Sequence, residues 1–174
     1  MVALAPWWSY HWLILVMSFA MTLSISTSEP ASTLAAAAKL ASHLQGGEVI
    51  ELRSDLGGGK TTFVKGLAAA LGYTGSVTSP TFTLSQIYQL PGGRELHHYD
   101  LYRLTEAGVV GSELSEDIGQ PDIITVIEWA GIAETALPAD RVVIDLIVTG
   151  ENDRELNFSA TGPQAAQLIE DIKQ

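Results

Sequence analysis

The sequence contains no cysteine and few basic residues. Without cysteine the chain forms no disulfide and offers no thiolate to a metal, which fits a reducing compartment, so we expect a cytoplasmic protein. Nine Lys and Arg stand against twenty Asp and Glu, a formal net charge of -11. A surface with this charge repels nucleic acid and anionic membranes. We therefore expect no binding of DNA, and contact with RNA only through a protein partner.

Charged side chains are also missing from the first twenty residues, which hold three of the four tryptophans. A secretory signal normally starts with a positive charge, and the first Lys or Arg here is Lys39, so a signal peptide is not expected. The unbroken apolar run in this segment is too short to span a membrane. The segment reaches the length of a transmembrane helix only if several polar residues within it are tolerated. We interpret residues 1–20 as an N-terminal extension. Either the start of translation has been assigned too far upstream of Met21, or the segment is a disordered extension or a membrane anchor. Residues 21–174 are predicted to form a single domain.

The hydrophobic pattern predicts strands and helices in alternation. A strand at 48–53 leads into a glycine-rich loop and then a helix over 60–71. Two strand-like runs around the turn 91–93 indicate a β-hairpin, which argues against a purely parallel sheet. The continuous apolar run 123–128 is typical of a buried central strand. The chain is therefore predicted to be a three-layer α/β domain with a mixed, partly antiparallel central sheet. The remaining expected elements are helices at 30–45, 112–118 and 162–173 and strands at 82–90, 94–104, 141–148 and 154–160.

The stretch SDLGGGKTT, residues 54–62, lies between the first predicted strand and the helix that follows it. Glycines at a helix N-terminus aim backbone N–H groups at one point, and the helix dipole favours an anion there. The stretch follows the P-loop pattern G-x-x-x-x-G-K-[ST], with Lys60 placed for the outer phosphates of ATP and Thr61 for magnesium. It departs from the pattern at Ser54, where positive φ would cost a serine about 1–3 kcal/mol of strain. We expect a competent site that this strain weakens.

Hydrolysis of a phosphoanhydride also needs carboxylates, to hold magnesium and to position water. Asp100 and Glu128 each stand at the end of a predicted strand, and ligands of open α/β sheets bind beyond these carboxyl ends. Thr81, within TSPTFTL, is either a switch-type hydroxyl or an ordinary turn residue. The expected catalytic residues are Lys60, Asp100 and Glu128. Thr61 and Glu128 are the expected magnesium ligands, although the sequence does not separate the roles of the two acids. The expected nucleotide-binding residues are Asp55, Gly57, Gly58, Gly59, Lys60, Thr61, Thr62 and Thr81.

Four stretches of the chain resemble the small bacterial P-loop ATPase family TsaE, and they occur in the family's order: DLGGGKTTFVKGLAAALG, VTSPTFTL, HHYDLYRL and VIEWA. The resemblance implies an ATPase that uses ATP and Mg²⁺ and supports formation of threonylcarbamoyladenosine in transfer RNA. It implies that the partner is a TsaB–TsaD transferase pair, whose turnover the ATPase gates. Lys60 and Thr61 match the family's phosphate and magnesium positions, Thr81 its switch threonine, and Asp100 and Glu128 its two acids.

Two other functions would use the same residues. A small-molecule P-loop kinase would need an acceptor pocket and usually an arginine-rich lid, and this chain has few arginines. A nucleotide-dependent binding module would bind ATP with little hydrolysis, its turnover reduced by Ser54, so that phosphate release separates it from an ATPase. A GTPase is not expected, because the guanine-reading sequence Asn-Lys-x-Asp is missing. His97 and His98 are expected on opposite faces of a strand and predict no zinc site, and no chemistry is assigned to His98, Tyr102 or Arg103.

Overall fold

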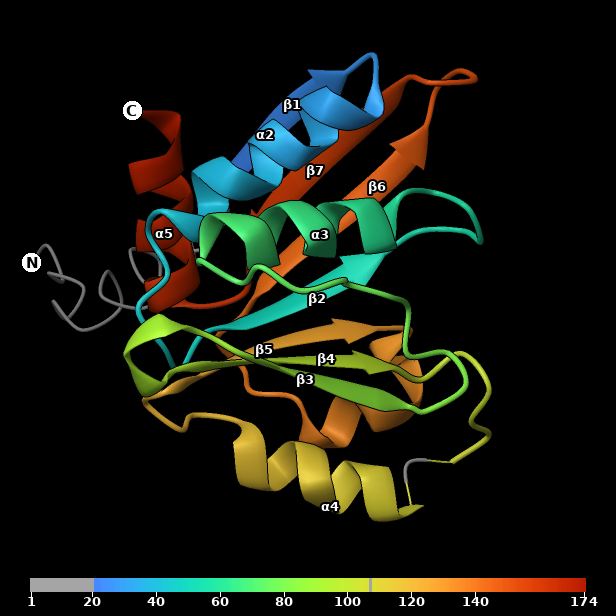
Figure 1. Ribbon diagram of the computed structural model, residues 1–174, viewed down its shortest axis with the longest axis vertical. Coiled ribbons are helices and arrows are strands. Elements are labelled where there is room, and N and C mark those ends of the chain that lie inside the picture. The colour runs from blue at the N-terminus through green and yellow to red at the C-terminus, as the bar shows by residue number, and fades with distance from the viewer. Residues whose placement is uncertain (1–20, 107) are drawn as a thin grey trace, which may run out of the picture.

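The computed structural model describes residues 21–106 and 108–174, in which a seven-stranded sheet carries helices on both faces (Figure 1). The N-terminal extension, residues 1–20, lies outside the described residues, and its interpretations stay predictions. In spatial order the strands are β1 (Thr22–Thr27), β7 (Arg154–Ala160), β6 (Val142–Val148), β2 (Val49–Arg53), β5 (Ile123–Glu128), β4 (Glu95–Asp100) and β3 (Ser85–Gln89).

The centre of the sheet is parallel and its two sides are antiparallel. β2 pairs in parallel with both β5 and β6, and β4 pairs in parallel with β5. The pairs β1–β7, β7–β6 and β3–β4 are antiparallel. Parallel strands are covered on both faces, which is why the sequences of β2 and β5 are nearly continuous buried runs. The prediction of a mixed sheet is confirmed.

Two helical layers enclose the sheet (Figure 1). On one face lie α2 (Pro30–Ala41), α3 (Lys60–Ala70) and α5 (Pro163–Lys173), and on the other lie α4 (Gly108–Asp117) and the 3₁₀ segment η2 (Ala130–Ala136). Each face has its own apolar cluster, and this confirms the predicted three-layer arrangement. Within the two described ranges no helix is both long and apolar enough to cross a bilayer.

Strand β1 has no counterpart among the predicted elements. It is an edge strand with alternating exposure, in which Leu23 and Ile25 are the apolar side chains that pack against the core, and Thr27 at its end is buried. The helix expected at 112–118 also begins earlier, at Gly108. Short or half-buried elements such as these carry a weak hydrophobic signal, because few of their side chains have to be apolar.

The β-hairpin is present, but both of its strands are shorter than predicted. The chain enters β3 through a turn in which the Pro80 carbonyl accepts the N–H groups of Thr83 and Leu84, so the strand begins at Ser85 rather than at 82. Its partner β4 ends at Asp100, because the carboxylate of this residue accepts the Tyr102 N–H and starts a turn. The 3₁₀ segment η1 (Pro91–Gly93) joins the strands.

Candidate functional site

The loop between β2 and α3 turns on glycines in the left-handed region. Gly57 has φ of 77° and Gly59 of 110°, conformations that residues with a side chain rarely adopt. A Cβ atom added to Gly57 would meet nothing within 4 Å, so the outer side of the loop is open. Because α3 begins at Lys60, the N–H groups of its first turn have no partner inside the helix. The loop thus presents a cluster of backbone donors at a helix N-terminus.

The side chain of Lys60 runs back across this loop and is almost fully buried. Its ammonium group donates hydrogen bonds to the carbonyls of Ser54 and Asp55, at 3.1 and 3.2 Å. The Glu128 carboxylate lies 3.9 Å away, and the ring of Trp129 lies 4.8 Å from the ammonium nitrogen. Two carbonyls, one carboxylate and one aromatic ring therefore surround the lysine ammonium and fix its position beneath the loop.

Ser54, the departure from the P-loop pattern, adopts an unstrained backbone. Among the described residues the non-glycine positions with positive φ are Leu84 and Trp129, and Ser54 is not one of them. The expected strain at Ser54 is therefore wrong, because this position of the loop does not need a left-handed conformation. The Ser54 hydroxyl donates to the Asp55 carbonyl at 3.1 Å. It fills the space beside Gly58, where an added Cβ would lie only 1.5 Å from the serine Oγ.

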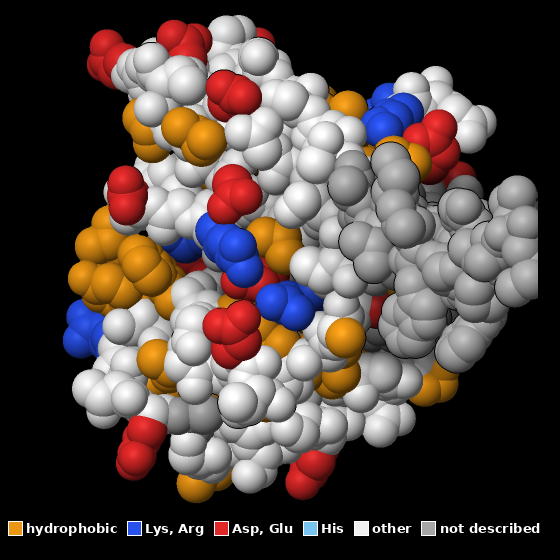
Figure 2. Space-filling model, turned by 180° about the vertical axis from the view of Figure 1, so that it is seen from behind, with side chains coloured by type: hydrophobic (Ala, Val, Ile, Leu, Met, Phe, Trp, Pro, Cys, Tyr) orange, Lys and Arg blue, Asp and Glu red, His pale blue; other side chains and the backbone are white. Residues whose placement is uncertain are grey.

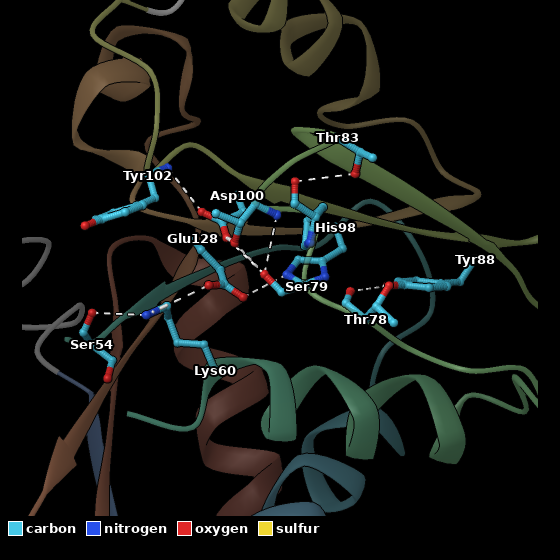
Figure 3. A network of polar contacts seen from close by, with 12 residues as sticks. Ser54, Lys60, Thr78, Ser79, Thr83, Tyr88, His98, Asp100, Tyr102 and Glu128 are labelled. Carbon is cyan, nitrogen blue, oxygen red and sulfur yellow. Dashed lines mark hydrogen bonds and ion pairs between the residues drawn. The ribbon is translucent and has the colours of Figure 1, made fainter. Parts of the chain in front are cut away.

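Asp100, at the end of β4, is surrounded by hydrogen-bond donors (Figure 3). The Thr81 hydroxyl donates to its Oδ2 in a short hydrogen bond, and the Ser79 hydroxyl donates to the same oxygen at 3.2 Å. The two hydroxyls lie 2.6 Å apart. Oδ1 accepts the Tyr102 N–H at 3.1 Å. The turn before β3 and the end of β4 are thus joined through one carboxylate.

Glu128, at the end of β5, is buried between a lysine and a histidine. One carboxylate oxygen, Oε2, faces the Lys60 ammonium, and the other, Oε1, lies 2.9 Å from Nε2 of His98. The neighbouring His97 contacts Asp117 of α4 on the opposite face of the sheet. The prediction that the two histidines point to opposite faces is confirmed.

One cleft of about 310 Å³ collects these groups at the carboxyl ends of three neighbouring strands. Asp100 and Glu128 are paired in the β4–β5 ladder, and Leu52 of β2 is paired with Glu128. Asp55, although predicted as a nucleotide-binding residue, does not line the cleft; its carbonyl alone reaches the site, through Lys60. The lining residues are Leu56, Gly57, Gly58, Gly59, Lys60, Thr61, Thr62, Ser79, Thr81, Asp100, Glu128 and Trp129.

Sequence reasoning did not assign a role to Ser79, Trp129 or His98. Ser79 stands two residues before Thr81, and its position in the TSPT turn gave no sign that its hydroxyl would reach Asp100. His98 could have been connected with the site, because residues i and i+2 of a strand share a face and His98 precedes Asp100 by two. Trp129 adopts φ of 59°, a strained conformation of the kind that clusters at functional sites.

Behind the loop, Glu51 of β2 is buried between two arginines. The Nε atoms of Arg53 and Arg141 lie 2.7 and 2.8 Å from its two oxygens. Burial raises the pKa of Glu51, but the hydrogen bonds and charges of Arg53 and Arg141 outweigh burial and hold the pKa below its ordinary value. The carboxylate is therefore ionised at neutral pH and ties β2, which leads into the loop, to the residue that precedes β6.

The donor set of the cleft fits a phosphate chain with a magnesium ion. Backbone N–H groups at the start of α3 and the Lys60 ammonium suit anionic oxygens. The Thr61 hydroxyl, Asp100 and Glu128 offer the oxygen ligands that Mg²⁺ prefers. No side chain blocks the open face of Gly57. An anion of several charges with a hard divalent cation is the ligand that this arrangement accommodates.

The chain matches the family described as "Threonylcarbamoyl adenosine biosynthesis protein TsaE" over residues 27–156. It belongs to the TsaE family. The TsaE protein of Bacillus subtilis is 37% identical over 151 residues, which cover 84% of this chain and 90% of the relative. The TsaE of Treponema pallidum is 40% identical over 121 residues, covering 67% and 84% respectively.

The crystal structure of Bacillus subtilis YdiB has the same fold as this TsaE chain. The two superpose with a TM-score of 0.76 at 34% sequence identity, over 88% of this chain and 95% of YdiB. The family resemblance and the P-loop fold class predicted from the sequence are both confirmed. The cleft described above lies inside the part of this TsaE chain that the family match covers.

Proposed function

We propose that this protein binds ATP with magnesium in the cleft and hydrolyses it, in support of threonylcarbamoyladenosine formation in transfer RNA. The observation that carries the proposal is the convergence of the glycine loop, Lys60 and two strand-end carboxylates on one cleft. Its position at the carboxyl ends of β2, β5 and β4 agrees with the general location of ligands in open α/β sheets. The names of the TsaE relatives support the biosynthetic context.

Binding of ATP requires Lys60 to change partners. Its ammonium now donates to the carbonyls of Ser54 and Asp55, and phosphate oxygens would replace these acceptors. Charge-assisted hydrogen bonds to phosphate are stronger than bonds to neutral carbonyls, so the exchange is favourable. The N–H group of Gly57 and those from Gly59 to Thr62 would hold the remaining phosphate oxygens, assisted by the dipole of α3, whereas the Gly58 N–H already donates to the Asp55 carbonyl.

The two acids are assigned different tasks. Glu128 and the Thr61 hydroxyl hold magnesium, because Glu128 already lies beside Lys60, the residue that holds the outer phosphates. Bound magnesium would neutralise charge on the phosphate oxygens. Asp100 positions the attacking water together with Thr81 and Ser79, whose hydroxyls reach the same carboxylate oxygen. Lys60 stabilises the charge that develops on the terminal phosphate.

The charge of the molecule indicates how it works with transfer RNA. Figure 2 shows acidic side chains spread over one face, with a small group of basic side chains near its middle. With a formal net charge of -11, binding of RNA by this chain alone is unfavourable. On this proposal a protein partner holds the RNA. The family resemblance implies that this partner is a TsaB–TsaD-type pair, whose turnover ATP hydrolysis gates in the cytoplasm. The alternative of a nucleotide-binding module with little hydrolysis rested mainly on strain at Ser54. It is less favoured here, because Ser54 does not adopt positive φ.

Replacing Lys60 tests the nucleotide site directly. Lys60→Ala removes charge-assisted bonds worth about 1.5–3 kcal/mol, and ATP affinity should fall about 10- to 100-fold. The matched control is Lys65→Ala, which removes an exposed lysine from the same helix and should leave affinity unchanged. Isothermal titration with ATP and magnesium provides the measurement. Equal affinity of the two variants would contradict the proposed site.

The assignment of the acids predicts a difference between Asp100→Asn and Glu128→Gln. Glu128→Gln should raise the magnesium concentration for half-maximal ATP hydrolysis about 10-fold or more, because it removes a charged metal ligand. Asp100→Asn should leave that concentration nearly unchanged and lower the maximal rate instead. Magnesium titrations of phosphate release separate the two effects, and the reverse pattern would exchange the roles of the acids.

A further inference from the structure

Among residues 21–106 and 108–174, His98 is the one histidine that is completely buried, and it lies against the candidate site. It lies on β4, and its ring shares a face with Asp100 and Glu128 (Figure 3). Nε2 lies 2.9 Å from Oε1 of Glu128. Its other ring nitrogen, Nδ1, has no hydrogen-bond partner within residues 21–106 and 108–174.

The surroundings of the ring determine which nitrogen carries the proton. A carboxylate oxygen accepts hydrogen bonds, so we assign Nε2 as the donor of the bond that it shares with Oε1 of Glu128. A proton on Nδ1 would leave a buried donor unsatisfied, whereas a bare Nδ1 avoids this. The nearby Tyr88 phenol donates to the Thr78 carbonyl and so does not serve Nδ1. The geometry therefore favours the tautomer that carries its hydrogen on Nε2.

This bond leaves the two oxygens of Glu128 unequal. Oε1 is occupied by His98 from within the core, and Oε2 faces Lys60 and the cleft. We propose that His98 is a positioning residue that fixes the rotamer of Glu128, so that this acid presents a single oxygen, Oε2, to the metal. The inference rests on the proposed function, since it concerns the residue assigned to magnesium there.

The tautomer is tested first, on the full chain without nucleotide. Two-bond ¹H–¹⁵N spectra at neutral pH should show His98 protonated at Nε2 and bare at Nδ1, with the resonances assigned by their loss in His98→Gln. A ring with its only proton on Nδ1 and none on Nε2 would overturn the proposal, because Nε2 could not then donate to Glu128. Since this experiment needs no ATP hydrolysis, it decides on the hydrogen bond even if the proposed function fails.

The role toward the metal is tested with two variants of His98. His98→Gln keeps an N–H donor at a similar reach, and His98→Leu fills the space without one. His98→Leu should raise the half-saturating magnesium concentration for ATP hydrolysis about 10-fold, as removal of a group behind a metal ligand typically does, and His98→Gln should stay within about threefold of wild type. ATP binding measured without magnesium should be the same in both variants.

Two comparisons separate positioning from a general loss of structure. His97→Gln changes the adjacent histidine on the opposite face and should leave the magnesium requirement unchanged. In a Glu128→Gln background, His98→Leu should cause no further change, because a residue that acts through Glu128 has nothing left to position. An unchanged magnesium requirement in His98→Leu, or an equal shift in both backgrounds, would overturn the proposal.

Discussion

Ser54 illustrates what a motif does and does not determine about a single residue. The pattern identifies Lys60 and Thr61 by type and spacing, and both line the cleft. It does not determine the backbone angles of Ser54, which depend on how β2 leads into the loop. Here those angles lie outside the left-handed region, and the serine hydroxyl occupies space that Gly58 leaves free. The loop therefore tolerates serine for a geometric reason that its sequence pattern does not contain.

Reversion of Ser54 to glycine should accordingly bring no gain in nucleotide binding. We expect Ser54→Gly to leave ATP affinity within about threefold and to lower the free energy of unfolding by about 0.5–1 kcal/mol, since glycine has more freedom in the unfolded chain. Titration calorimetry and urea unfolding measure the two quantities. A tenfold gain in affinity would show that the serine distorts the loop after all.

The elements that build the site were predictable where burial is complete on both faces. The run 123–128 and the strand before the glycine loop became β5 and β2, the two adjacent parallel strands at the centre of the sheet. The edge strand β1 and the exact ends of the hairpin were not predictable, because half-buried residues and side-chain turns such as that of Asp100 decide them. The network of Ser79, Thr81 and Asp100 could not be foreseen for the same reason.

The packing of α2 against α3 gives a prediction for one helical glycine. A Cβ atom at Gly66 would lie 2.7 Å from the Leu34 carbonyl oxygen and 2.9 Å from the Ala37 Cβ. Alanine normally stabilises a helix interior by up to about 1 kcal/mol over glycine, but overpacking here costs about 1–3 kcal/mol. Gly66→Ala should therefore lower the free energy of unfolding.

The control is an exposed position of the same helix. Ala69→Gly should cost about 1 kcal/mol, which is the ordinary helix preference without any packing term. Urea unfolding of both variants shows whether the helices meet as closely as the structure has them. Stabilisation by Gly66→Ala would mean that α2 can move away from α3.

At the scale of the whole molecule, the chain is a P-loop domain with an acidic surface. Its fold class followed from the hydrophobic pattern and its family from the order of four motifs, because motif spacing reflects the order of strands and loops. Hydrolysis depends on bound ATP and magnesium, and the identity of a partner depends on the surface of a second protein, so neither could be predicted from the fold of this chain. The molecule combines a cleft that suits ATP with a surface that disfavours RNA, so contact with transfer RNA is expected through a protein pair.

Phosphate release from ATP and magnesium by the full chain, measured alone and with a purified TsaB–TsaD pair, is the decisive experiment for the proposed function. We expect slow release alone and a clear rise when the pair is added. Lys60→Ala should remove both, whereas Lys65→Ala should remove neither. If the wild-type chain binds ATP but releases no phosphate with or without the pair, the protein is a binding module and the proposed hydrolysis is wrong.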